Sequence, residues 1–140
     1  MHNNRVYEKL KEIEENVEII RANLPSSEQE FKALGLVKDG IYKRLEHCIE
    51  NVIDILSMMY ADLNLGIPSD DNEIIDGVHK KKLISKEVAR IVKNMKGLRN
   101  ILVHKYGKID DELMYDILSN QLKDFDLITK EIINYIDHQH

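Results

Sequence analysis

Apolar residues recur along most of this 140-residue chain at alternating spacings of three and four. Such spacing places them on one side of an α-helix, whereas a half-buried strand would show them at every second position. No stretch of the sequence keeps that strict alternation. The pattern therefore predicts an all-α fold. The clearest example is the series Val6, Leu10, Ile13, Val17, Ile20 and Leu24.

Proline, serine and glycine mark the helix breaks in the first half of the chain. Pro25 ends a first helix, and Ser26 or Ser27 offers an N-cap for a second helical region. That region loosens around Gly35 and Gly40 and then continues as the longest helix, which we expect to form the spine of the core. Its apolar positions are Ile41, Leu45, Ile49, Val52, Ile53, Leu56, Met59 and Leu63.

The second half of the chain is divided in the same way. Residues 64–72 contain Gly66, Pro68 and two aspartates, which predict a loop, and a short helix is expected over residues 73–83. Ser85 is a plain N-cap for the next helix, and the acids that begin at Asp110 open a last helix that runs to near the C-terminus. We therefore predict one domain over residues 1–140, an up-and-down helical bundle of four long helices plus a short helix.

Cysteine content and hydropathy limit where the protein works. The single Cys48 excludes an internal disulfide, and its place in an apolar pattern predicts a buried thiol in a reducing compartment. No apolar run approaches the roughly 20 residues of a membrane span. The charged N-terminal stretch has no signal-peptide core. We expect a cytoplasmic protein that does not contact the membrane.

Residues 95–110 are the stretch that departs from generic helix. Asn100 and His104 are four apart on the polar side of the predicted helix, which Gly107 is expected to end. Arg99 and Tyr106 fall at the edge of the apolar side. Because a guanidinium cannot lose its proton, Arg99 needs a carboxylate, a phosphate or a partner chain beside it. The apolar side itself carries Val88, Ile91, Val92, Met95, Leu98 and Leu102.

Positive charge is concentrated around the same stretch. Between residues 79 and 108 ten Lys and Arg accompany one acid, so the segment carries +9 and the remaining chain −14. The basic side chains form either an ordinary solvated face or a contact surface for a phosphate-rich partner. The excess of ten basic residues over one acid makes an ordinary solvated face less favoured. Aromatic residues do not interleave with them, so contact with backbone phosphate is favoured over base stacking. The residues assigned to this phosphate contact are Lys86, Arg90, Lys93, Lys96 and Lys105.

One string in this stretch resembles the Arg-Asn-x-Leu-Val-His-x-Tyr motif of the HepT-like toxin branch of the HEPN domain family. It consists of Arg99, Asn100, Leu102, Val103, His104 and Tyr106, followed by Asp110. The resemblance implies a HEPN fold and a metal-independent endoribonuclease. It assigns catalysis to Arg99 and His104, with Asn100 and Asp110 in support, and it implies a homodimer with the site in the cleft between two chains.

The chemistry of these residue types agrees with that role. An imidazole has an ordinary pKa of about 6.5 and exchanges a proton near neutral pH, while a guanidinium can hold two phosphate oxygens. Arg99 and His104 lie five residues apart, roughly 140° around a regular helix. One helix therefore does not aim both at the same phosphate unless it unwinds near Gly107. Two copies facing each other across a two-fold axis would bring Arg99 of one chain near His104 of the other.

The resemblance also implies a partner protein. In this family the tyrosine of the motif, here Tyr106, accepts AMP groups from a small nucleotidyltransferase of the MNT type. That enzyme is the antitoxin of a type VII-like toxin–antitoxin pair. An added nucleotide would repel and block incoming RNA. From position alone, Tyr106 is equally well explained as an aromatic residue packed at the dimer edge.

Other functions and sites stay open at this point. The chain could be a non-catalytic helical substrate-binding subunit of a small nucleotidyltransferase, or a dimerisation module without chemistry. Glu46, Glu50 and Asp54 lie four apart and are more often a solvated helix face than a ligand set. We expect no metal site, because His47 and His79 lack ligands at the usual spacings. No cofactor is expected, since the sequence has no glycine-rich phosphate loop.

Overall fold

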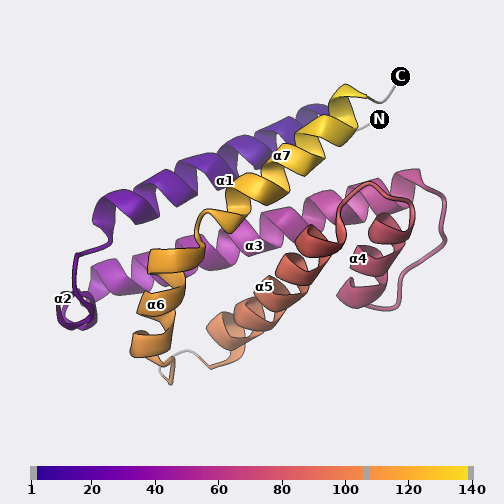
Figure 1. Cartoon of the computed structure of the whole chain (residues 1–140). Coiled ribbons are helices and arrows are strands. Elements are labelled where there is room, and N and C mark those ends of the chain that lie inside the picture. The colour runs from indigo at the N-terminus through magenta and orange to yellow at the C-terminus, as the bar shows by residue number, and fades with distance from the viewer. Residues whose placement is uncertain (1–2, 106–107, 139–140) are drawn as a thin grey trace.

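The computed structural model describes residues 3–105 and 108–138 and folds them into helices, with no β-strand among these residues (Figure 1). Helix α1 (Asn3–Asn23) is followed by the short α2 (Glu28–Lys32) and the long α3 (Leu36–Asp62). Helix α4 (Asp71–Lys80) leads to the motif helix α5 (Lys86–His104). Helices α6 (Asp111–Gln121) and α7 (Asp124–Asp137) complete the described chain. The predicted all-α fold is confirmed.

Helix α3 lies at the centre of the bundle. Helix α1 packs along it, and α4 and α5 pack against it and against each other. In Figure 1 α1 and α7 run side by side above α3, while α4 and α5 lie below it. Helix α6 packs against α2 at one end of the bundle. Because α3 has neighbours on two sides, it buries side chains around much of its circumference.

The apolar spacing read from the sequence corresponds to the core. All five central apolar residues of α1 are buried, and α7 buries residues at the same spacing. Each fully buried aliphatic side chain stabilises the fold by about 1.5–3 kcal/mol. Cys48 is buried as predicted, and burial raises the pKa of its thiol to about 12. Among the described residues, no helix combines the length and the apolar composition that a membrane span requires.

Four helix starts are fixed by N-cap side chains. Ser27 accepts a hydrogen bond from the backbone N–H of Glu30, and Ser85 accepts one from Val88. The predicted N-cap at Ser85 is thus confirmed. Of the two serines after Pro25, Ser27 is the N-cap. Asp70 and Asp110 cap α4 and α6 in the same way. Each such cap typically contributes about 1 kcal/mol.

Three predicted helical segments have different boundaries. The predicted last helix is two helices, because the chain turns at Leu122 and Lys123. Helix α6 packs on α2 and α7 packs on α1, so the chain bends to follow two separate helices. The apolar spacing runs through this turn without a change, which is why the sequence did not show it. Helix α4 begins at Asp71 instead of residue 73 and ends at Lys80. The second predicted helical region is also two helices, since α2 ends at Lys32 and α3 begins at Leu36 after Gly35, whereas Gly40 lies inside α3. With the divided last helix, the described residues form seven helices instead of five.

Candidate active site

The motif helix α5 separates a buried side from an exposed side. Val88, Ile91, Val92, Met95 and Leu102 are buried against the core, and Leu98 is half-buried. Asn100 and His104 are exposed on the other side, as their spacing predicted. The site is therefore open to solvent, and it lies at the C-terminal end of α5.

Arg99 leaves α5 toward α4 and is held there by a carboxylate. Its Nη2 donates a hydrogen bond to Asp71 Oδ2 at 2.9 Å, and the two side chains are 22% and 29% exposed. The same Nη2 lies 3.3 Å from Asn100 Oδ1, which accepts from it. The structure thus supplies the carboxylate that the partly buried guanidinium requires. Because both contacts use Nη2, the rest of the planar guanidinium remains available for a phosphate.

Asp71 is the site residue that the sequence analysis missed. It stands in the first turn of α4, directly after the Asp70 cap, and was assigned to a loop. The two partners are 28 residues apart in the sequence, so no local spacing connects them. The sequence pointed to this contact only indirectly. Arg99 was expected to need an anion, and two aspartates stand at the start of the preceding helix.

Part of the basic face is also neutralised by α4. Lys93 forms an ion pair with Asp76 at 2.6 Å, and Lys96 donates to Asn72 Oδ1 at 3.1 Å. Lys86, Arg90 and Lys105 are exposed and form no ion pair within the described part of the chain. The five residues assigned to RNA binding therefore fall into two groups. Those beside α4 are restrained, and those at the two ends of α5 are free to meet a ligand.

The end of α5 decides how Arg99 and His104 can be used. The helix is regular through His104, and Lys105 is its C-cap, whose N–H bonds to the carbonyl of Ile101. Tyr106 and Gly107 lie outside the described residues. Because the helix does not unwind before His104, Arg99 and His104 diverge by roughly 140° around its axis. Arg99 faces α4, whereas His104 faces solvent.

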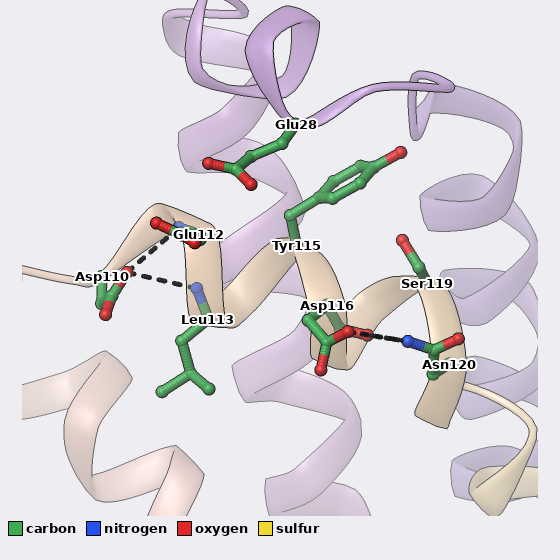
Figure 2. Close-up of a pocket in the computed structure, with 8 residues that line it drawn as sticks. All are labelled: Glu28, Asp110, Glu112, Leu113, Tyr115, Asp116, Ser119 and Asn120. Carbon is green, nitrogen blue, oxygen red and sulfur yellow. Dashed lines mark hydrogen bonds between the residues drawn. The ribbon is translucent and has the colours of Figure 1, made fainter.

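Asp110 acts at the start of α6. Its Oδ1 accepts hydrogen bonds from the N–H groups of Glu112 and Leu113, which Figure 2 shows as dashed lines. It also lines a shallow hollow of about 720 Å³ together with the carboxylates of Glu28, Glu112 and Asp116. The four carboxylates give this hollow a negative charge that opposes the binding of phosphate, although Glu28 is paired with Lys32 at 2.9 Å.

A polar cluster anchors α6 to α3 just beyond the motif. Asp111 accepts hydrogen bonds from Lys38 Nζ at 2.7 Å and from the Tyr42 hydroxyl at 2.6 Å. Burial alone would raise the pKa of the Asp111 carboxyl, but these two bonds outweigh it and the pKa lies below its ordinary value. The carboxylate is therefore charged at neutral pH. This cluster fixes where the connection after His104 must end.

The acids of α3 do not converge on one point. Glu46 pairs with Lys43 at 2.9 Å, and Asp54 pairs with Lys9 at 3.3 Å. The structure, over the residues it describes, contains no group of three or more His, Cys, Asp or Glu side chains that could hold a metal ion. His47 is instead close to Glu12, at 3.1 Å.

Several known proteins resemble this chain over most of its length. The mRNA nuclease HepT of Shewanella oneidensis is 29% identical over 97 residues, which cover 69% of this chain and 73% of that protein. The tRNA nuclease HepT of Aphanizomenon flos-aquae is 27% identical over 92 residues, which cover 66% of this chain and 63% of that protein. A solved structure of the tri-AMPylated Shewanella oneidensis HEPN toxin in complex with MNT antitoxin is also similar. Its TM-score is 0.83 at 25% identity, over 93% of this chain and 97% of that one.

The helical fold, with the Arg-Asn and His of the motif at the exposed end of α5, defines a HEPN protein. The family model described as ribonuclease HepT-like matches residues 13–132. The chain belongs to the ribonuclease HepT-like family. The resemblance seen in the sequence is thereby confirmed, and the nucleases among the relatives support a ribonuclease activity.

Proposed function

We propose that this chain is the endoribonuclease toxin of a type VII-like toxin–antitoxin pair and that it cuts RNA with Arg99 and His104 and without a metal ion. One observation carries the proposal. In a chain of the ribonuclease HepT-like family, Arg99 is oriented by Asp71 while Asn100 and His104 stand exposed at the end of α5. An oriented guanidinium and an accessible imidazole are the two groups that this chemistry needs.

The proposed reaction is an attack of the RNA on its own backbone. The oxygen of a 2′-hydroxyl bonds to the adjacent phosphorus while His104 accepts its proton. The bond from phosphorus to the 5′-oxygen breaks, and His104 returns the proton to that oxygen. Arg99 stabilises the negative charge that builds up on the phosphate oxygens. The products are a 2′,3′-cyclic phosphate and a 5′-hydroxyl.

The remaining assigned residues support this chemistry. Asn100 accepts from Arg99 and would help to hold the guanidinium in place. Asp110 supports the site by capping α6, which sets the end of the connection after His104. The basic residues assigned above would bind the RNA backbone, and those without an ion pair are the most available for it.

A homodimer is part of the proposal because one chain does not complete the site. Arg99 and His104 of the same helix face different directions, so a second copy would supply the other half of each site. Apolar side chains are exposed near the motif, with Val103 at 43% and Leu113 at 50%. Covering them would favour association.

We further propose that a small MNT-type nucleotidyltransferase neutralises the toxin by transferring AMP to Tyr106. The phenolic oxygen would attack the α-phosphate of a nucleoside triphosphate and release pyrophosphate. The relative whose solved structure contains an MNT antitoxin is itself tri-AMPylated, which supports this assignment. A phosphate attached two residues after His104 would compete with RNA for Arg99.

The test is cleavage of a defined RNA by the purified full-length protein in EDTA, followed by analysis of the product ends. We expect cleavage to persist and to leave a cyclic phosphate and a 5′-hydroxyl. Arg99→Ala and His104→Ala should abolish cleavage with unchanged helical content, and Arg99→Lys should also fail because an ammonium does not grip two oxygens. Cleavage that disappears on chelation would refute the metal-free reaction, and cleavage retained by His104→Ala would make His104 structural.

A further inference from the structure

A cluster of unpaired positive charge lies away from the motif, at the turn between α4 and α5. Its residues form what we call the basic corner: Lys80, Lys81, Lys82, Lys86 and Arg90. All five are exposed, and none forms an ion pair with any residue in the described ranges. Of the cations closer to the motif, Lys93 and Arg99 are paired with acids of α4, whereas Lys105 is exposed and forms no ion pair within the described residues. The net attraction for a polyanion is therefore displaced toward the corner.

The backbone at this corner accommodates a lysine where glycine is favoured. Lys82 has a φ of 62°. Its N–H bonds to the His79 carbonyl at 2.8 Å, and the N–H of Leu83 bonds to the Val78 carbonyl at 3.2 Å. This pattern ends α4 with a left-handed residue, a position at which glycine avoids a cost of about 1 kcal/mol. Keeping a third consecutive lysine there is consistent with a use for its charge.

Beside the corner the surface is hollowed between α4 and α5. The hollow has a volume of about 770 Å³ and is lined by His79, Lys86, Arg90 and Lys93, with the acids Asp76 and Glu87. The carboxylate of Asp76 is already paired with Lys93. At the start of α5 the Val88 N–H donates to Ser85 Oγ, and the N–H and hydroxyl of Ser85 donate to the carboxylate of Glu131, whose negative charge opposes an anion there. A ligand here would be held by side chains.

One residue of the basic corner and one residue of the motif lie on the same side of α5. Lys86 and His104 are 18 residues apart, which is five turns of about 3.6 residues, so both side chains leave the same side of the helix about 27 Å apart. Gly97 lies within roughly 20° of the line that joins them, and no atom comes within 4 Å of a Cβ built on it. A strand lying along α5 would therefore meet open space at Gly97 and, on the same side of the helix, the ion pair of Lys93 and Asp76.

We propose that the basic corner is a second binding site for RNA backbone phosphates, which holds the substrate about 27 Å from the cleaved bond. This inference rests on the proposed ribonuclease function. At roughly 3.4 Å per stacked nucleotide the distance corresponds to about eight nucleotides. The enzyme therefore favours RNA long enough to reach the corner, and the corner sets affinity for the substrate without taking part in the chemistry.

The test compares two variants made in a non-cleaving His104→Ala background of the full chain. The corner variant combines Lys81→Gln with Lys82→Gly. The control combines Lys123→Gln, Lys130→Gln and Asn64→Gly. Both variants remove two lysines and place glycine at one left-handed position, since Asn64 has a φ of 55°. Neither should unfold more easily in urea than the parent, so weaker binding reports on charge at the corner.

Binding is measured by fluorescence anisotropy with RNAs of about 20 and about 4 nucleotides over a range of salt. The corner variant should bind the long RNA about fivefold or more weakly, and the salt slope should fall by about 0.7 for each phosphate that the corner no longer neutralises. The control variant should match the parent with both RNAs, and the corner variant should lose less affinity for the short RNA, which is too short to contact the corner and the motif together. Equal affinity of corner variant and control for the long RNA would overturn the proposal.

Two further outcomes separate this inference from the proposed function. A wild-type chain that binds long RNA through the corner but leaves it uncut would refute the nuclease and keep the binding site. The corner substitutions can also be made in the active chain with His104 intact. If that chain keeps its RNA affinity but escapes neutralisation by its nucleotidyltransferase, the RNA site is overturned, because the corner would then dock a protein.

Discussion

Asp71 sets the direction of the Arg99 side chain. A pair with 22% and 29% of its side chains exposed contributes little to folding, on the order of 0–1 kcal/mol. Its value lies in restraining a long side chain that would otherwise sample many rotamers. Asp71 is therefore a positioning residue in the proposed reaction.

Asp71→Ala should slow RNA cleavage by about 10- to 100-fold while the urea midpoint stays nearly unchanged, because the guanidinium loses its orientation and the core is not disturbed. Asp76→Ala is the matched control, since it removes the ion pair to Lys93 between the same two helices. That control should not slow cleavage. A rate for Asp71→Ala at or above the wild type would mean that Asp71 restrains Arg99 in an inactive pair.

Tyr106 is the residue at which neutralisation is proposed to act. Co-expression with an MNT-type nucleotidyltransferase antitoxin should add the mass of one or more AMP groups to the peptide that contains Tyr106. Tyr106→Phe lacks the attacking oxygen, so it should stay unmodified and remain toxic. Growth assays and mass spectrometry measure the two results. A Phe variant that is still fully neutralised would show that inhibition works by binding alone.

Among the elements, α4 is held against α3 by an unusually close approach. A Cβ placed on Gly77 would lie 2.5 Å from the ring of Tyr60, which is itself 4% exposed. Gly77→Ala should therefore lower the free energy of unfolding by about 1–3 kcal/mol. Gly40→Ala, in a helical position with nothing within 4 Å, should raise it by about 0.5–1 kcal/mol. Urea unfolding measures both. A stabilised Gly77→Ala would mean that α4 shifts freely on α3.

Elements were predictable from the sequence where local spacing determines them. The apolar side of α5 and the cap at Ser85 depend on neighbours within a turn, so they were predicted correctly. The turn at Leu122 and the contact between Arg99 and Asp71 depend on helices that are distant in the sequence. No local pattern records those contacts. The motif string identified the family, but its geometry required the packing of α4 against α5.

At the scale of the whole molecule, the proposed site belongs to two chains. Arg99→Ala and His104→Ala are each expected to be inactive, yet a mixed dimer keeps one intact pair of Arg99 and His104 across the two-fold axis. Random mixing should then restore about a quarter of the wild-type rate. Each variant alone is the control. No recovery from co-purified mixed dimers would place both residues of a site on one chain, and light scattering at the 16.4 kDa mass of a single chain would refute the dimer.

The acidic hollow of α6 and α2 in Figure 2 has a consequence for how RNA arrives. Its carboxylates and the lysines at the α4–α5 turn give the surface two regions of opposite sign. Within roughly one Debye length, about 8 Å at physiological salt, a polyanion is repelled by one region and drawn to the other. RNA should therefore approach the protein preferentially from the side of the lysines before any contact forms. The rate of productive encounter should fall with added salt more steeply than the rate of dissociation rises.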